Sequence, residues 1–189
     1  RIATRQSRLA LWQAEFVGSA LSDAGHDFEL IKTLTEGDRV QDRFLHEIGG
    51  KGLFIRELEQ AMLQERADIA AHSLKDLPVR LPEGFELCAI VKRHVVTDSL
   101  ILHPRHQKQI PMISGDPLGW LSDGAKKIAT SSLRRSMILH HINPQIECVQ
   151  IRGNVDTRLS KLRNSNDWDA TILASASLER LGLYEDLAA

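Results

Sequence analysis

A cation and a carboxylate stand next to each other at Lys75 and Asp76. The residues before them, 67–71, form a short run of small and apolar side chains, which predicts a buried strand that stops before Pro78. Open α/β sheets bind ligands where such strands end. Lys75 and Asp76 are therefore candidates for a binding or catalytic site. A solvated Lys–Asp pair on a loop is the alternative, because surface ion pairs are common.

Several other predicted strand ends carry residues of the same kind. They are Thr4-Arg5-Gln6-Ser7, Thr130-Ser131-Ser132-Leu133-Arg134-Arg135, Arg152-Gly153-Asn154 and Ala174-Ser175. In a parallel sheet these ends share one edge, so we expect a cleft that is rich in arginine, hydroxyl groups and backbone N–H groups. Arginine binds carboxylate and phosphate in a planar, bidentate manner. The sequence therefore predicts a small polyanionic ligand, foremost a polycarboxylate.

The alternative for each arginine is an ordinary surface charge. Arg134 and Arg135 argue against it, because they stand at a predicted helix start, where the helix dipole disfavours cations. Asp76 is the anion in this cationic group, and the surrounding positive charge favours its ionised form. Such a carboxylate could hold an N–H donor or stabilise a developing cation. A salt bridge from Asp76 to Lys75 or to a neighbouring arginine is the competing interpretation.

A glycine-rich segment follows a long polar loop that spans residues 35–48 and contains Asp38. Gly49-Gly50-Lys51-Gly52 leads into a predicted helix at about 53–66. The spacing of a phosphate-binding loop is absent, because the first glycine is missing and Gly52 stands where Ser or Thr is required. Backbone N–H groups at a helix start can still bind an anion, and Lys51 could assist. A solvated lysine in a flexible loop is the alternative for Lys51.

Predicted strands and helices alternate along the chain. Strands are expected at residues 2–4, 28–34, 67–71, 85–92, 98–103, 127–130, 146–151 and 169–174, and helices after Ser7, at 53–66, after Ser131-Ser132, at 155–163 and after Ser175. This order predicts an α/β fold with mainly parallel strands. The first helix presents an apolar face made of Leu9, Trp12, Phe16, Ala20 and Leu21. Residues 103–124 are expected to form a surface excursion near a domain boundary, with His103 and His106 as solvated loop residues.

Composition restricts the class of protein. The chain has 189 residues, 42% of them hydrophobic, and a net charge of -1, which is ordinary for one large or two small globular domains. The near-neutral charge argues against a general nucleic-acid binder. No apolar run approaches the ~20 residues that span a membrane. Cys88 and Cys148 are expected to be separate buried thiols without metal-site spacing, so no metal is predicted.

Five motifs in this sequence resemble those of one enzyme family. They are Arg1-Ile2-Ala3-Thr4-Arg5-Gln6-Ser7, Gly49-Gly50-Lys51-Gly52-Leu53-Phe54, Ala70-Ala71-His72-Ser73-Leu74-Lys75-Asp76-Leu77-Pro78, Thr130-Ser131-Ser132-Leu133-Arg134-Arg135 and Arg152-Gly153-Asn154-Val155-Asp156-Thr157-Arg158-Leu159. On these motifs the chain resembles the hydroxymethylbilane synthases, also called porphobilinogen deaminases. The motifs occur in the family's order and extend over most of the chain.

The resemblance implies a cytoplasmic, monomeric transferase of tetrapyrrole, porphyrin and haem biosynthesis. The family joins four porphobilinogen molecules head to tail, releases ammonia each time, and yields the linear tetrapyrrole hydroxymethylbilane. Growth starts from a dipyrromethane cofactor that is linked to a cysteine. The first two family domains resemble the lobes of type II periplasmic binding proteins, with the active site between them. Here the lobes would be residues 1–96 and 97–189, with a hinge near 93–100.

The resemblance also assigns roles to residues. Asp76 would be the catalytic carboxylate that binds pyrrole N–H groups and stabilises the cationic azafulvene formed as ammonia leaves. Asp38 and Lys51 would belong to a mobile loop over the site. The carboxylates of cofactor and substrate would be held by Arg5, Ser7, Lys75, Ser131, Ser132, Arg134, Arg135, Arg152, Arg158 and Arg180. This agrees with the polycarboxylate inferred from the strand ends.

The chain departs from the family pattern in three places. The family's third domain, which carries the cofactor cysteine, is expected to be absent, and neither Cys88 nor Cys148 matches the motif of that cysteine. Residues 92–98 lack the expected acidic, arginine-containing hinge pattern, and 103–124 look longer than usual. A non-catalytic two-lobe module that binds a polycarboxylate remains the alternative function. Asp76 discriminates between the two, because a pure anion receptor gains nothing from a carboxylate at its centre.

Overall fold

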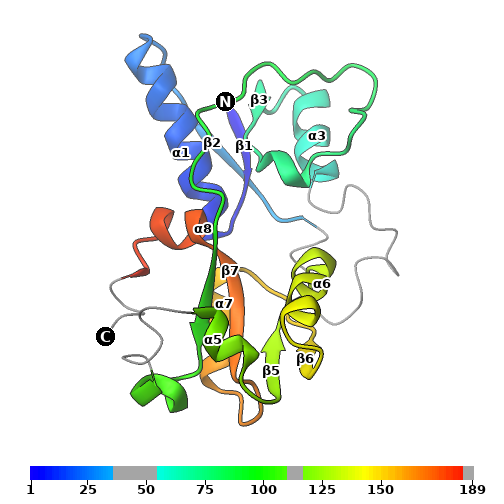
Figure 1. The fold of residues 1–189 in the computed structure, drawn as a ribbon. Helices are drawn as coiled ribbons and strands as arrows, with labels where there is room; N and C mark the ends of the chain where they lie inside the picture. Colours follow the sequence, from blue (N-terminus) through cyan, green and yellow to red (C-terminus); the bar gives the residue numbers. More distant parts are fainter. Residues whose placement is uncertain (36–54, 110–116, 185–189) are drawn as a thin grey trace. The chain divides into compact units, whose positions relative to one another are not determined.

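Two separate sheets organise the chain, which a computed structural model describes over residues 1–35, 55–109 and 117–184 (Figure 1). The chain divides into Arg1–Arg93, here called unit 1, and His94–Ala189, called unit 2, and each unit contains one sheet. The expectation that all the strand ends share one sheet edge is therefore wrong. No helix within the described ranges is long and apolar enough to cross a membrane.

Unit 1 is built on a parallel sheet of three strands in the order β2-β1-β3. The strands are β1 (Ile2–Arg5), β2 (Leu30–Thr33) and β3 (Ile69–Ala70), and Ile2 pairs with both Leu30 and Ile69. β1 lies in the centre, and Ile2, Ala3 and Thr4 are completely buried. Its apolar and β-branched residues suit a strand that is covered on both faces. The helix α3 (Arg56–Leu63) packs on this sheet through the buried side chains Leu58 and Ala61.

The helix α1 (Arg8–Asp23) begins as the sequence predicts but buries a different face. Ser7 caps it, because the Ser7 hydroxyl accepts a hydrogen bond from the Ala10 N–H. The buried residues of α1 are Ala10, Ala14 and Gly18, whereas Phe16 is exposed. Small side chains let the helix approach its neighbours closely, and a Cβ atom at Gly18 would overlap the Phe28 ring. The predicted face of large apolar residues is therefore only partly right: Leu9, Trp12 and Leu21 are half-buried, whereas Phe16 and Ala20 are exposed.

Unit 2 is built on a mixed sheet of four strands in the order β4-β7-β5-β6. The strands are β4 (Asp98–Leu102), β5 (Lys126–Ala129), β6 (Ile146–Val149) and β7 (Ala170–Ala174). β5 runs parallel to β6 and β7, while β4 is antiparallel to β7 and pairs Asp98 with Ala174. The predicted α/β class with mainly parallel strands is confirmed.

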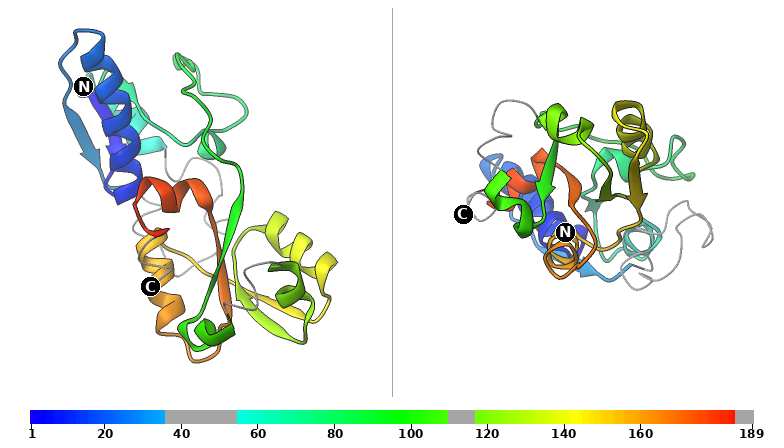
Figure 2. Two further views of the ribbon diagram at one scale, coloured as in Figure 1. Left: turned by 60° about the vertical axis from the view of Figure 1, so that its left-hand side comes forward. Right: turned by 60° about the horizontal axis from the view of Figure 1, so that its bottom comes forward.

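Helices cover both faces of the sheet in unit 2 (Figure 2). α5 (Pro117–Ser122) and α6 (Leu133–Ile142) pack on one face, where Leu121 and Leu139 meet Ile128 and Ile146. α7 (Val155–Arg163) and α8 (Ser175–Arg180) pack on the other, where Leu159, Leu162 and Leu178 meet Ile101 and Leu173. The buried residues of both clusters are leucine and isoleucine, with Ala170 added on the first face, so unit 2 has a three-layer α/β core.

The strand predicted at residues 85–92 is absent. This segment is irregular, and Leu87, Ile90 and Val91 are exposed. Apolar and β-branched residues favour a strand only where a neighbouring strand can pair with their backbone. Cys88 is consequently exposed and Cys148 half-buried, so the prediction of two buried thiols is wrong.

Residues 103–124 lie inside unit 2 and not at the boundary between the units. They include η2 (Pro104–Gln109), a 3₁₀ helix, and α5. His106 is not a solvated loop residue, because its Nε2 lies 2.8 Å from the Asp169 carboxylate, which also accepts from Arg105 and from the Lys127 N–H. His106 is held in place by a charge-assisted contact with Asp169, the residue before β7. The two residues are far apart in the sequence, so a local sequence pattern does not reveal this contact.

Candidate active site

The carboxyl ends of β1 and β3 lie at the same edge of the sheet in unit 1. The pairing of these strands continues one residue past β3, because the Ala71 N–H donates to the Ala3 carbonyl over 3.1 Å. Arg5 ends β1, and His72 follows β3 on the neighbouring strand. Continuing the register of Ala3 with Ala70 places Arg5 beside His72. The sheet therefore brings the Arg5–Ser7 turn next to the segment that carries Asp76.

A single 3₁₀ turn, η1 (Leu74–Asp76), presents Lys75 and Asp76. The Asp76 N–H donates to the Ser73 carbonyl over 2.9 Å, and the Ser73 hydroxyl accepts a hydrogen bond of 2.8 Å from Gln13 of α1. Both Lys75 and Asp76 are exposed. Among the described residues, neither side chain forms a hydrogen bond or an ion pair, so the Asp76–Lys75 salt bridge is not present there. Asp76 is thus available to an incoming donor.

His72 is a residue of this group that sequence reasoning missed. Burial lowers the pKa of its imidazole, the Asp76 carboxylate opposes this shift, and the Arg5 guanidinium adds to it. The net direction favours the neutral imidazole at neutral pH. The sequence signal was its position between the end of β3 and Asp76.

In unit 2 the hydroxyl groups of Ser131 and Ser132 serve the fold. The Ser132 hydroxyl caps α6 by accepting from the Arg135 N–H. The Ser131 hydroxyl donates to the Ile151 carbonyl and accepts a 3.1 Å hydrogen bond from the Ile151 N–H. These contacts join the segment after β5 to the segment after β6. They leave the first turn of α6, with Arg134 and Arg135, at the end of the sheet.

Arg134 and Arg135 share one carboxylate, that of Asp98 at the start of β4. Arg135 donates to Asp98 from Nη2 and Nε, over 2.5 and 3.0 Å, and from Nη1 to the Ile172 carbonyl over 3.0 Å. Arg134 donates to the same Asp98 through Nη2 over 3.2 Å. The side chain of Arg135 is only 12% exposed, whereas that of Arg134 is 65% exposed. No local pattern in the sequence indicates that Asp98, 36 residues before Arg134, is a partner of this pair.

Arg135, Arg152 and Arg158 form a cluster of like charges. Arg158 donates through Nε to the Gly153 carbonyl over 2.8 Å. Burial lowers the pKa of Arg158, and the positive charges of Arg135 and Arg152 lower it further. Arg152 Nη1 is buried and has no hydrogen-bond partner among the described residues. Burying a guanidinium nitrogen without a hydrogen-bond partner is unfavourable, and like charges repel, so this cluster is suited to an added anion.

The remaining predicted residues lie elsewhere. Ser7 supplies the cap of α1, as described above, and Ser175 begins α8 without capping it, since Ala174 is the residue before the first turn. Arg180 lies in the last turn of α8, where burial lowers the pKa of its guanidinium against the opposing charge of Glu179. Asp38 and Lys51 lie outside the described residues. The described ranges hold no group of three or more His, Cys, Asp or Glu side chains that could bind a metal ion.

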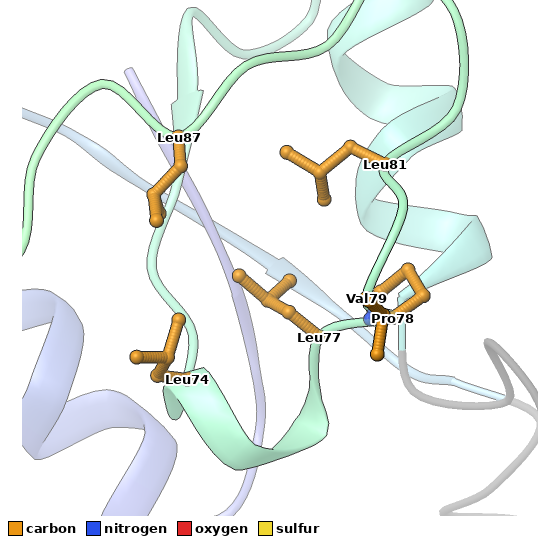
Figure 3. A pocket seen from close by; sticks show the side chains of 6 residues that line it. All are labelled: Leu74, Leu77, Pro78, Val79, Leu81 and Leu87. Atoms are coloured by element: carbon orange, nitrogen blue, oxygen red, sulfur yellow. The ribbon is translucent and has the colours of Figure 1, made fainter.

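Unit 1 also contains an apolar pocket of about 370 Å³, lined by residues on either side of Asp76 in the sequence (Figure 3). Its walls are the side chains of Leu74, Leu77, Pro78, Val79, Leu81 and Leu87. None of these side chains carries a charge or a hydrogen-bonding group. The pocket therefore does not suit a polycarboxylate, and the polar strand ends remain the candidate site.

These features define a class: an α/β protein whose cationic side chains at strand ends are suited to small anions. Comparison with known proteins narrows this class. All of residues 1–189 match the sequence model of the family described as "Porphobilinogen deaminase, dipyromethane cofactor binding domain". The chain belongs to the porphobilinogen deaminase family.

Relatives are similar along the whole chain. The porphobilinogen deaminase of a Nitratiruptor species is 46% identical over 186 residues, which cover 98% of this chain and 56% of the relative. That of Albidiferax ferrireducens is 43% identical over 188 residues, covering 100% and 56%. The chloroplastic porphobilinogen deaminase of Euglena gracilis is 47% identical over 190 residues, covering 98% and 37%. The chain thus spans about half the length of the bacterial relatives.

Proposed function

We propose that the protein containing this chain is a hydroxymethylbilane synthase, a transferase that condenses four porphobilinogen molecules head to tail and releases ammonia. The observation that carries this proposal is the unbroken match of residues 1–189 to the porphobilinogen deaminase family. The local chemistry supports it, because arginines gather at the strand ends and porphobilinogen carries two carboxylates.

Asp76 is the catalytic carboxylate in this proposal. It accepts hydrogen bonds from the pyrrole N–H groups and stabilises the positive charge that develops on the substrate as ammonia leaves. Its exposure, and the lack of any hydrogen bond or ion pair to its side chain among the described residues, support this role. A carboxylate already paired with Lys75 would have to break that pair before it could meet the substrate.

The cationic residues hold the carboxylates of substrate and cofactor. In unit 1 these residues are Arg5, Ser7 and Lys75, and in unit 2 they are Ser131, Ser132, Arg134, Arg135, Arg152, Arg158 and Arg180. Asp38 and Lys51 are proposed for the loop over the site. The serine hydroxyls already serve as caps and clamps, so they contribute chiefly by fixing the turns from which the arginines extend.

The residues of unit 2 fit the family's dipyrromethane cofactor. When bound, this group supplies the pyrrole to which the first substrate is joined, and it brings carboxylates into the site. Arg152 Nη1, which is buried without a hydrogen-bond partner in the described ranges, and the neighbouring Arg135 and Arg158 are suited to those carboxylates. Neither Cys88 nor Cys148 is proposed as its attachment point.

We further propose that units 1 and 2 correspond to two lobes like those of type II periplasmic binding proteins, 1–96 and 97–189, with the hinge near 93–100. Separate sheets and separate cores support this proposal. The family resemblance is also our reason for proposing a monomer in the cytoplasm.

The test is to incubate the full-length protein with porphobilinogen and to measure ammonia release and hydroxymethylbilane formation. We expect both products in a ratio of four ammonia molecules for each tetrapyrrole. Saturable binding of porphobilinogen without release of ammonia would instead support the two-lobe binding module, and the enzymatic proposal would then fail.

A further inference from the structure

Asp98 is a carboxylate that contacts two of the arginines proposed to bind the ligand, Arg134 and Arg135. It accepts three hydrogen bonds from them, two from Arg135 and one from Arg134. Arg135 donates through Nε to Oδ2 and through Nη2 to Oδ1 of Asp98. This is the bidentate geometry that arginine uses for a carboxylate ligand. The protein thus presents to this pair the same chemical group that the ligand would present.

The charge of Asp98 is maintained at neutral pH. Burial by itself would raise the pKa of the Asp98 carboxyl, but the hydrogen bonds and positive charges of Arg135 and Arg134 outweigh it and lower the pKa. The two guanidiniums and the ionised Asp98 together therefore carry a net charge of about +1, whereas the two guanidiniums alone would carry about +2. An incoming carboxylate meets a reduced charge and a partner that is already engaged.

We propose that Asp98 is a resident counter-carboxylate: it occupies the Arg134–Arg135 pair and thereby limits how tightly these arginines bind a carboxylate of the ligand. Arg134 is largely exposed and forms only one hydrogen bond with Asp98, so it is the arginine that a carboxylate of the ligand contacts first. Arg135 is held by three hydrogen bonds and is the arginine for which the two carboxylates compete. This inference deepens the proposed function and rests on it for the identity of the ligand.

The position of Asp98 explains why it can compete without blocking the site. It stands at the start of β4, whose antiparallel pairing with β7 places it opposite Ala174, next to the start of α8. The backbone is therefore fixed, and only the short side chain reaches the arginines. A fixed acceptor offers a constant competing interaction, which weakens a tight carboxylate site and allows its ligand to leave.

The experiment compares Asp98→Asn with wild type in the full-length protein. Asparagine keeps the size of the side chain and one acceptor oxygen but removes the negative charge. Calorimetric titration with tricarballylate, a tricarboxylate without a pyrrole, should show about three- to tenfold tighter binding in the variant, with a steeper dependence on salt. The KM for porphobilinogen should fall by a similar factor. A purely structural role for Asp98 would predict weaker or unchanged binding.

The matched control is Asp68→Asn in unit 1. Asp68 also accepts two hydrogen bonds from an arginine side chain, that of Arg1, over 3.2 and 3.0 Å, and its loss changes the net charge equally. We expect the affinity of the Asp68→Asn protein for tricarballylate, and its KM for porphobilinogen, to match those of wild type. If Asp68→Asn tightened binding as much as Asp98→Asn, overall charge would account for the effect and the proposal would be overturned.

A second measurement covers the case in which Asp98→Asn does not fold. In the wild-type protein, the carbon-13 signal of the Asp98 carboxyl should shift in a saturable manner as tricarballylate is added, because the ligand displaces it from Arg135. An unchanged Asp98 signal at saturation would overturn the proposal. If tricarballylate gives the expected results but porphobilinogen neither binds nor reacts, the proposed function fails while the role of Asp98 as a competing carboxylate stands.

Discussion

Units 1 and 2 both have a cluster of polar residues after a strand, but the side chains of the two clusters differ in how they are hydrogen-bonded. In unit 1, Lys75 and Asp76 project from one 3₁₀ turn, and their side chains form no hydrogen bond or ion pair within the described ranges. In unit 2, Ser131, Ser132 and Arg135 are all hydrogen-bonded into the surrounding fold. This difference suits the proposed roles, because a catalytic Asp76 must be available to the substrate, whereas Arg135 would hold a ligand from a fixed frame.

The cores of the two units differ in the same direction. The buried cluster of unit 1 consists of Ala3, Leu58, Ala61 and Ala67, in which only one side chain is large. Unit 2 has two clusters, one on each face of its sheet, made mainly of leucine and isoleucine. Burial of apolar area stabilises by roughly 25 cal/mol per Å². The described part of unit 1 therefore has less hydrophobic support than unit 2.

The largest expected effects come from substitutions that create a cavity in each core. Leu58→Ala and Leu139→Ala both remove a fully or almost fully buried leucine, and each should reduce the free energy of unfolding of its own unit by about 2–5 kcal/mol. Because each core cluster of the described residues lies within one unit, hydrogen exchange should accelerate mainly in the unit that carries the change. Equal acceleration in both units would show that the two cores are not independent.

Smaller changes in stability are expected from the two neighbouring arginines, and they should differ between Arg134 and Arg135. Arg135→Gln should lower the stability of unit 2 by about 1–3 kcal/mol, because it leaves Asp98 and the Ile172 carbonyl without their donors. Arg134→Gln should change it by less than about 0.5 kcal/mol, because Arg134 is largely exposed. Urea unfolding of the two variants measures both values. Similar losses would contradict the distinction between a fixed and a ligand-accessible arginine.

The smallest expected effect concerns pH and His72. Its folded-state pKa lies below that of the unfolded chain, so the unfolded chain binds the proton more readily. The contribution of neutral His72 is thus present above about pH 6.5 and is lost as the pH falls from there through the folded pKa. In His72→Gln this part of the pH dependence should vanish. NMR titration should also show the His72 pKa falling in Asp76→Asn and rising in Arg5→Gln, and the opposite shifts would contradict the proximity of these groups.

Local signals in the sequence were sufficient for much of the fold. The predicted capping residues Ser7 and Ser132 mark the starts of α1 and α6, and α7, which Asn154 caps, has the predicted bounds of 155–163. Capping is a contact between residues two or three positions apart, so it can be inferred from a short window. The α/β alternation likewise follows from local periodicity.

Contacts between distant residues were not predictable in the same way. Asp98 meets Arg135 only because β4 pairs antiparallel with β7, and His106 meets Asp169 across a separation of 63 residues. The segment 85–92 has the composition of a strand, but composition does not specify a pairing partner. The role of Asp76 could be proposed from its motif, whereas the counter-carboxylate could be recognised only from the folded structure.

The most direct test of the central claim is the turnover of Asp76→Asn in the full-length protein, with Asp68→Asn as a control of equal charge. If Asp76 stabilises the charge that develops as ammonia leaves, the kcat for porphobilinogen should fall by about 10²-fold or more. Its circular dichroism and Tm should remain those of wild type, because the exposed Asp76 carboxylate makes no hydrogen bond or ion pair with another described residue. A folded Asp76→Asn protein with the turnover of wild type would contradict the account.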